Sequence, residues 1–463
     1  MPSDRRQAVR EGAQYLRAVR PIDPEEVATF VPGGAHPGVV RTDLRALAPE
    51  LGLVERPDGT FVPVPSEPVD PDFEGVEALP TRVVDRVEAA LVETFGPDWA
   101  SGADRERLQA TIDRLKAAYD AGEPIEYDRE TVLAYACYHL PTHYAAACYV
   151  LDELGRDGLL EHELRILDVG AGIGGPAIAV DEYLPDDALV EYHAVEPSDA
   201  ALELFETLTD GLGRNRHVRT HEQPAADATV EGSFDLVLFS SVLSELAAPA
   251  DTAASYLEHV DQAGTLALIS TGDRETSTTL RSVERTLVDD RDLAAVYAPT
   301  VRLWADARPT DRGWSWRRDP DLAVPAFQAA LMDGDDTYRN TSVRYSYALL
   351  RPDGRERYDG TLDRALWGRM ADAEDHVTNR VDLVGAKLSP DLGTGNPLFK
   401  VSDGSETVDH YAVLVHESEL TQPLLRAPYG ALLAFENVLV LWNDDEAGYN
   451  LVVDDEAIVE PFA

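Results

Sequence analysis

A glycine-rich turn between an apolar run and a helical pattern is the clearest chemical signal in this chain. The segment Asp168-Val-Gly-Ala-Gly-Ile-Gly-Gly175 follows the apolar run Leu164-Arg-Ile-Leu167. The next apolar run ends in an acidic residue, Glu196, which lies 22 positions after Gly174. A strand, a tight glycine turn, a helix and a carboxylate at this spacing are the parts of a nucleotide-binding βαβ unit.

The chemistry of this turn favours S-adenosylmethionine (SAM) over a dinucleotide. SAM has an amino group, a carboxylate and a ribose, but no phosphate. We expect Asp168 to hold the amino group, directly or through water, and Glu196 to accept the ribose hydroxyl protons. Glycines allow close approach of ligand and backbone, and the following helix N-terminus suits the methionyl carboxylate. A nicotinamide site and a fold that has lost its ligand are the alternatives.

The expected cofactor contacts extend beyond the two carboxylates. Asp227 is expected to contact the adenine, the alternative being a solvated loop acid. The full predicted set is Asp168, Gly170, Ala171, Gly172, Gly174, Glu196, Pro197, Asp227 and Ser240.

The segment after the apolar run Phe234–Phe239 does not name a methyl acceptor. It reads Ser240-Ser-Val-Leu-Ser-Glu-Leu246. An Asn/Asp-Pro-Pro-aromatic motif would indicate an amino nitrogen, and a cysteine would indicate cytosine chemistry; neither is present. The serines and Glu245 equally suit helix capping and an ion pair. Alignment of the acceptor dominates methyl transfer, so the catalytic residue stays unknown.

Alternating strand and helix patterns position the turn within residues 156–355, which predicts an α/β core with a parallel sheet. Residues 297–341 are irregular and contain three tryptophans. The predicted strands are 164–168, 190–195, 234–239, 264–270 and about 343–350, and the predicted helices are 174–183, 199–209, 251–260 and 276–290.

Three further modules flank this core. Residues 1–65 show three helical patterns and a hairpin around Pro57-Asp-Gly59, as in a winged helix, which would contact either nucleic acid or protein. Residues 66–155 read as a linker and helical bridge, with Pro141 as a break. Residues 356–463 read as a β-rich module, with an OB-like barrel as one possibility.

The chain is strongly acidic, with 85 Asp and Glu against 40 Lys and Arg and a formal charge of −45. Only three of the basic residues are lysines. This pattern is typical of proteins from halophilic cytoplasm, where salt screens repulsion; an acidic surface for a basic partner is the alternative. Repulsion of nucleic acid weakens at high salt, so the charge does not exclude an RNA partner.

Cysteines and targeting signals are sparse. Cys137 and Cys148 form no CxxC or Cys/His cluster, so no metal site is expected. The first 20 residues are charged throughout, and no apolar run approaches the roughly 18 residues of a membrane helix. We therefore expect a cytoplasmic protein without membrane contact, of unknown oligomeric state.

Several short motifs in fixed order carry a family resemblance over about residues 80–380. Tyr135, Leu140-Pro-Thr-His-Tyr144 and Asp152-Glu-Leu154 precede the glycine turn, and Leu243-Ser-Glu-Leu246 and Arg344-Tyr-Ser-Tyr347-Ala-Leu-Leu350 follow it. The set resembles the methyltransferase-like family of mitochondrial small-ribosomal-subunit assembly factors and their prokaryotic relatives, within the class I SAM-dependent methyltransferases. The resemblance implies SAM binding and contact with small-subunit ribosomal RNA.

The chain departs from that family at one stretch. Many members hold an iron–sulfur cluster on cysteines near the last strands, but residues 297–316 contain no cysteine. Because such clusters need thiolates, no cluster is expected. The three tryptophans would either form a small apolar core or, with nearby arginines, a stacking and phosphate-contacting surface for RNA. These residues are Trp304, Trp314 and Trp316, and Arg302, Arg308, Arg312, Arg317 and Arg318.

Three functions remain open at this point. The first is a SAM-dependent RNA methyltransferase, or methyltransferase-like factor, of the small ribosomal subunit. The second is a non-catalytic assembly factor that uses SAM only to order its pocket. The third is a small-molecule methyltransferase with accessory modules.

Overall fold

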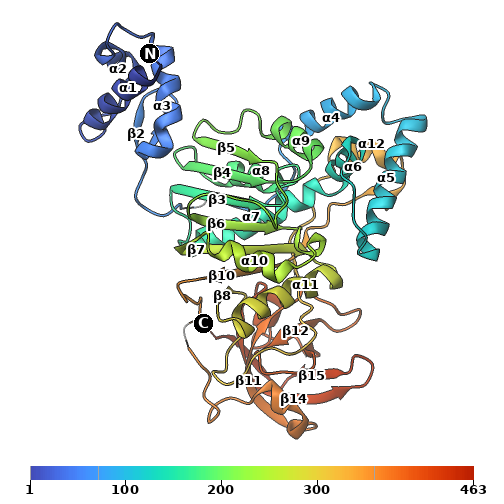
Figure 1. Cartoon of the computed structure of the whole chain (residues 1–463). Helices are drawn as coiled ribbons and strands as arrows, with labels where there is room; N and C mark the ends of the chain where they lie inside the picture. Colours follow the sequence, from blue (N-terminus) through green and yellow to red (C-terminus); the bar gives the residue numbers. More distant parts are fainter. Residues whose placement is uncertain (1, 71, 359, 463) are drawn as a thin grey trace. The chain divides into compact units, whose positions relative to one another are not determined.

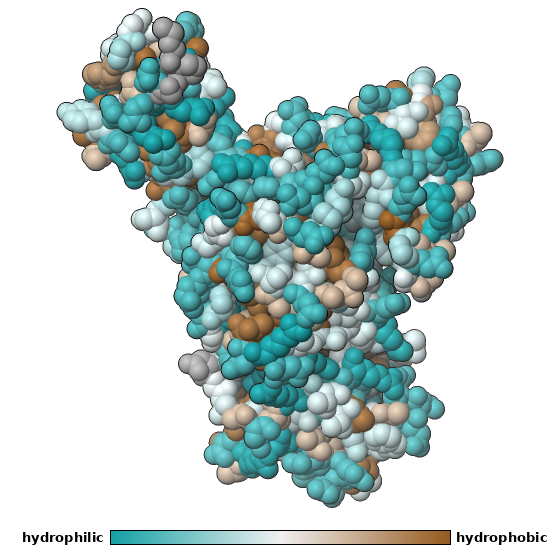
Figure 2. Space-filling model, in the orientation of Figure 1, coloured by the Kyte–Doolittle hydropathy of each residue, from teal (hydrophilic) through white to brown (hydrophobic). Residues whose placement is uncertain are grey.

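The computed structural model describes residues 2–70, 72–358 and 360–462 (Figure 1). Its contacts divide into two units, which we describe separately. The first comprises Met1–Leu236 and Leu322–Asn340, and the second Val237–Asp321 and Thr341–Ala463. Figure 2 shows hydrophilic residues over most of the visible face, with apolar residues scattered among them. No helix of the described ranges is long and apolar enough to span a bilayer.

The first unit opens with three helices and a β-hairpin, as the sequence predicts. Asp23 caps the second helix by accepting a hydrogen bond from the Glu25 N–H. Glu55 is buried at the end of the first strand and forms ion pairs with Arg41 and Arg45 of the third helix. The elements are α1 (Pro2–Leu16), α2 (Pro24–Phe30), α3 (Pro37–Leu51), β1 (Leu53–Glu55) and β2 (Phe61–Pro63).

A helical bridge follows. Pro141 lies in the first turn of a new helix, where proline costs no hydrogen bond, so the apolar pattern of 130–154 divides at His139. A later helix packs against this bridge, where Gln328 donates to the Cys137 carbonyl at 3.0 Å. The elements are α4 (Thr81–Phe95), α5 (Gly102–Ala121), α6 (Arg129–Tyr138), α7 (Leu140–Arg156) and α12 (Ala326–Met332).

Three parallel strands with helices between them complete the first unit. Strand β3 pairs with β4, and β4 with β5, both in parallel. The side chains of β5 are half-buried or exposed, and its sequence contains no apolar run, so no strand is predicted there. The elements are β3 (Glu163–Val169), α8 (Gly175–Tyr183), β4 (Leu189–Val195), α9 (Asp199–Thr209) and β5 (Arg216–His221); β6 (Phe234–Ser240) starts here and ends in the second unit.

The second unit begins with the remaining part of this α/β core. Its last long strand, β10, runs antiparallel to β7 and to β8, so the core is mixed rather than all-parallel as predicted. The predicted α/β class with a Rossmann-like core is confirmed. The elements are η1 (Leu243–Glu245), α10 (Pro249–Leu257), β7 (Val260–Thr271), α11 (Arg274–Arg285), a π-helical turn η2 (Thr286–Asp290), β8 (Ala295–Ala298), β9 (Arg317–Arg318) and β10 (Arg344–Arg351).

A closed β-barrel ends the chain. Its strands follow the order β11-β12-β13-β15-β14, and a further pairing of β11 with β14 closes the ring. Strands β13 and β15 are parallel. This order, with a helix before the fourth strand, is that of an OB-type barrel, so the OB-like possibility is correct. The elements are η4 (Met370–His376), β11 (Arg380–Lys387), β12 (Leu398–Ser402), β13 (His410–Leu414), α13 (Pro423–Arg426), β14 (Leu432–Asn443), β15 (Gly448–Val453) and β16 (Ile458–Pro461).

Part of the irregular segment 297–316 is bound to this barrel through buried polar contacts. The Trp304 indole N–H donates to Asp403 at 2.7 Å. The Lys400 ammonium lies 2.7 Å from both Asp311 and Asp409. Burial lowers the pKa of Lys400, but the two carboxylates outweigh it and raise the pKa overall. A Cβ on Gly404 would lie 1.8 Å from the Val301 carbonyl oxygen, so the two backbones are in direct contact.

We predict that Lys400→Met destabilises the protein by about 3–5 kcal/mol, because the change leaves the buried Asp409 carboxylate without a cation and Asp311 with Arg285 alone. Chemical unfolding at neutral pH measures this. The matched control is Arg426→Met, which removes an exposed arginine that has no ion pair within the described ranges; its effect should stay within about 0.5 kcal/mol. Equal effects of the two changes would contradict a structural role for the buried ammonium.

Candidate functional site

The glycine turn is joined to the end of the neighbouring strand through its backbone. The N–H groups of Gly170 and Ala171 donate to the Val195 carbonyl at 2.8 and 3.0 Å. Gly170, Gly172 and Gly174 have φ values of +74°, +53° and +89°, in the region where glycine is favoured. The backbone conformation of the turn from β3 into α8 therefore favours glycine at all three positions.

Gly172 and Gly174 differ in their surroundings. A Cβ on Gly174 would lie 2.8 Å from the Phe205 ring, because α9 packs directly on the turn. A Cβ on Gly172 would meet no atom within 4 Å. The space over Gly172 is thus open to a ligand, whereas that over Gly174 is filled by the protein.

Glu196 ends β4 and holds the turn. Its carboxylate is buried and accepts hydrogen bonds from the Gly172 N–H at 3.0 Å and from the Ser198 N–H at 2.9 Å. Burial raises the pKa of Glu196, and these two hydrogen bonds oppose the rise. Each oxygen accepts only one of these bonds and can accept a further one.

Asp168 lies at the end of β3 and is fully buried. One carboxylate oxygen accepts a hydrogen bond from the Tyr192 hydroxyl at 2.5 Å, while Oδ1 has no partner among the described residues. Burial raises the pKa of Asp168 to about 7; the Tyr192 bond opposes this, and the nearby Glu196 adds to it. A buried acceptor without a donor is unfavourable, so a cationic ligand group is the natural partner.

The structure brings Asp168, the glycine turn and Glu196 together, but not every predicted contact. Ala171 is buried in the turn, and Pro197 is exposed beside Glu196. Asp227 is exposed in a turn, where its backbone N–H donates to the Pro224 carbonyl. Its contact with adenine stays a prediction. Ser240 ends β6 in the second unit and stays a prediction as well.

Sequence reasoning missed several residues that complete this site. Tyr192 orients Asp168, and its position on the neighbouring strand gave no signal of this. Ser198 caps α9 and donates to the Tyr127 carbonyl at 3.0 Å, which brings the segment before α6 to the site.

The same bridge also supplies a hydrogen-bonded pair, Tyr135 and His143, 2.8 Å apart. An alanine methyl placed on Gly175, at the start of α8, would lie 3.8 Å from the His143 Cβ. Burial lowers the pKa of His143 to about 4, so its imidazole is neutral. The spacing of eight within one helical pattern was the available signal for this pair.

Three segments of the chain match known family models. Residues 129–301 match the model of the family described as mitochondrial small ribosomal subunit Rsm22. The predicted resemblance is confirmed over this segment. Residues 6–57 and 371–462 match the N-terminal and C-terminal domains of DUF8157, a domain of unknown function. No curated protein matches the chain.

Several solved methyltransferase structures are similar to part of the chain. The sugar N-methyltransferase KedS8 from Streptoalloteichus sp. is 20% identical over 27% of this chain, which spans about half of that enzyme (47%), with a TM-score of 0.22. The plantazolicin methyltransferase BpumL with SAH is 10% identical over 59% of this chain and 97% of its own, with a TM-score of 0.30. Magnesium protoporphyrin IX methyltransferase from Synechocystis with bound SAM is 15% identical over 47% and 88%, with a TM-score of 0.27.

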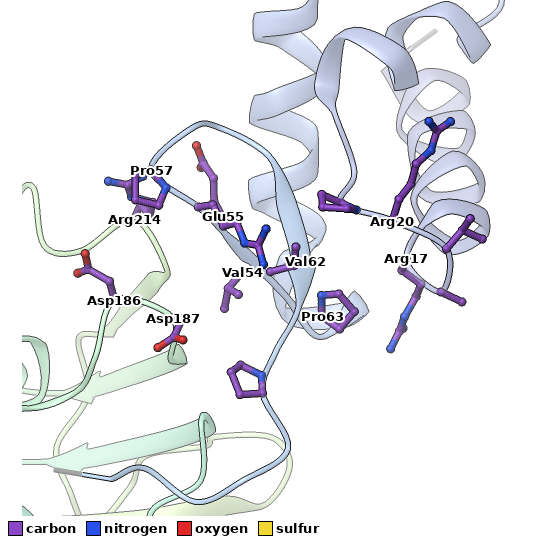
Figure 3. Close-up of a pocket in the computed structure, with 15 residues that line it drawn as sticks. Arg17, Arg20, Val54, Glu55, Pro57, Val62, Pro63, Asp186, Asp187 and Arg214 are labelled. Atoms are coloured by element: carbon purple, nitrogen blue, oxygen red, sulfur yellow. The ribbon is translucent and has the colours of Figure 1, made fainter.

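A separate hollow of about 520 Å³ lies in the first unit, away from the glycine turn (Figure 3). Its walls come from the end of α1, the β1–β2 hairpin and the loops around Asp186 and Arg214. None of the predicted cofactor residues lines it. Arginine and aspartate side chains share its rim, so its charge favours no single class of ligand.

We predict that Gly174→Ala destabilises the protein by about 1–3 kcal/mol more than Gly172→Ala. Both changes place a side chain at positive φ, which costs about 1–2 kcal/mol, but only the methyl at 174 meets the Phe205 ring. Thermal unfolding of the two variants in parallel measures the difference. If both are equally stable, α9 does not pack on the turn as described.

Proposed function

We propose that this chain binds SAM at the glycine turn and acts on small-subunit ribosomal RNA, or on the assembling small subunit, as a methyltransferase or methyltransferase-like factor. The single observation that carries the cofactor assignment is the buried Asp168 oxygen without a donor, next to the open space over Gly172. The Rsm22 match over residues 129–301 supports the ribosomal assignment.

The roles of the residues follow from their chemistry. Asp168 would bind the amino group of SAM, and Glu196 would accept hydrogen bonds from the ribose hydroxyls. The first turn of α8 would receive the methionyl carboxylate, because helix N-termini attract anions. The sulfonium of SAM supplies a methyl group that is already activated, so the remaining task of the protein is to align the acceptor.

A non-catalytic assembly factor is the second candidate. It is supported by the segment Ser240–Leu246, which contains neither an Asn/Asp-Pro-Pro-aromatic motif nor a cysteine to indicate a methyl acceptor. In this case SAM would complete the pocket without losing its methyl group. A cytoplasmic location and a salt-rich habitat remain predictions from composition, and a small-molecule acceptor remains the third candidate.

We predict that the affinity for SAM falls about tenfold as the pH falls from 8 to 6. The SAM amino group is cationic and binds the ionised form of Asp168, whose pKa of about 7 means that it becomes protonated across this range. Calorimetric titration with SAM at several pH values measures this. The control Asp168→Asn should bind weakly at every pH. A wild-type affinity that does not change with pH would contradict the role of Asp168.

We also predict that the protein sediments with small-subunit particles in gradients of cell extracts, because the Rsm22 match includes helices α6 and α7 of the bridge and the glycine turn. In a strain that lacks the protein, expression of the wild type or of Asp168→Asn then separates the two main candidates. Loss of one methylated nucleotide with Asp168→Asn supports catalysis, whereas full assembly without that loss supports a scaffold. A protein that stays at the top of the gradient would contradict the ribosomal assignment.

A further inference from the structure

Two tryptophans of the irregular segment are partly exposed, whereas the third is not. Trp304 is buried and bonded to Asp403, as in the apolar-core prediction. Trp314 and Trp316 are half-buried, and Ser315 between them points inward. The Ser315 hydroxyl accepts a hydrogen bond from Arg281 at 3.2 Å and lies 3.1 Å from the Tyr429 hydroxyl. The inward serine thus anchors the segment and leaves the two indole rings at its outer side.

Each of these two rings carries an arginine. The Arg274 guanidinium lies 4.7 Å from the centre of the Trp314 ring, and that of Arg344 lies 5.8 Å from the centre of the Trp316 ring. Arg274 opens α11 directly after β7, and Arg344 opens β10. The Gly272 N–H donates to the Arg344 carbonyl at 3.1 Å, so both arginines lie at the carboxyl end of β7.

The two arginines lack acidic partners within the described part of the chain, although acidic residues outnumber basic ones by 85 to 40. Asp273, next to Arg274, instead accepts hydrogen bonds from Thr271 and Thr276. Both guanidinium groups are exposed and free to bind an anion.

Most of the arginines predicted to form an RNA surface bind acidic residues or a backbone carbonyl of the chain itself. Arg302 pairs with Glu284 and Asp289, while Arg317 and Arg318 pair with Asp319 and Asp321. Arg308 and Arg312 are exposed and have no ion pair among the described residues, although Arg308 donates to the Asp289 carbonyl. Three of the five predicted arginines are thus ion-paired within the chain, and the RNA surface stays a prediction.

A second observation marks Trp314. Its indole N–H is buried and has no acceptor among the described residues. Buried donors in native structures nearly always have a partner. A small shift of the ring on binding would allow a ligand oxygen or nitrogen to accept this hydrogen bond.

We propose that Trp314, Trp316, Arg274 and Arg344 form a stacking platform for unpaired nucleotides of an RNA strand. Indole faces stack on bases of any sequence, and arginine both stacks and binds phosphate. Base faces are accessible in single strands but not in a duplex, so the platform takes single-stranded RNA. In open α/β sheets ligands bind outside the carboxyl ends of the strands, which is where the platform lies. This inference rests on the proposed function and specifies its substrate.

The test uses the full chain and a short fluorescent single-stranded RNA, with fluorescence anisotropy as the readout. The double variant Trp314→Leu/Trp316→Leu should raise the Kd at least tenfold. The matched control is Trp442→Leu, a tryptophan of the barrel that is 42% exposed, and it should leave the Kd unchanged. The same RNA annealed to its complement should bind at least tenfold more weakly than the single strand.

A second pair of variants keeps the test valid if the tryptophan variants fold poorly. Arg274→Gln/Arg344→Gln changes exposed side chains only and should raise the Kd several-fold and reduce its salt dependence. Arg426→Gln is the matched control. Circular dichroism and thermal unfolding confirm the fold of every variant.

The outcomes separate this inference from the proposed function. Wild-type affinity in both double variants, or equal binding of duplex and single strand, overturns the platform. Wild-type protein that binds SAM but no RNA also overturns it, and leaves the cofactor site standing. Loss of RNA binding in the variants, with no heat of SAM binding in the wild type, supports the platform and overturns the cofactor assignment.

Discussion

Cations are scarce for the buried carboxylates of this chain, because 85 acidic residues share 40 basic ones. The interior follows this constraint closely: Glu55 has Arg41 and Arg45, Glu284 has Arg281 and Arg302, and Asp311 has Arg285 and Lys400. Asp168 and Glu406 are buried without a cation, and each has one carboxylate oxygen without a hydrogen-bond partner among the described residues. Under the proposed function, the amino group of SAM would supply the positive charge that Asp168 lacks.

The scarcity of basic residues also bears on Arg274 and Arg344, which have no acidic partner among the described residues. Carboxylates are the commonest available partners for an arginine in this protein. The exposed guanidinium groups of Arg274 and Arg344 instead lie over indole rings, away from any carboxylate partner among the described residues. The segment that contains these rings is held in place by buried contacts of Ser315, Trp304 and Asp311. Rigid support of this kind lowers the entropic cost of ordering the contact surface on binding.

Local signals were enough to predict much of the fold and the centre of the site. The glycine turn, Glu196 and the Asp23 cap depend on residues within one or two neighbouring elements. Strand β5 escaped prediction because its alternating polar residues, such as Arg216 and Arg219, give no apolar run. The antiparallel course of β10, the barrel closure between β11 and β14, and the pairing of Arg274 with Trp314 depend on residues 40 or more positions apart. No local pattern encodes such contacts.

The contacts of Gly404 and its neighbours with the segment before the barrel show where the barrel domain begins in physical terms. The family match to the C-terminal domain begins at residue 371, yet the barrel interior uses Trp304 and Asp311 from the preceding segment. The boundary of sequence similarity and the boundary of physical independence therefore do not coincide. A barrel transferred to another protein from residue 371 onward would lose the Trp304 hydrogen bond to Asp403 and the Asp311 partner of Lys400, but would keep the Lys400–Asp409 pair. The C-terminal family domain is therefore stabilised in part by residues that precede its own first residue.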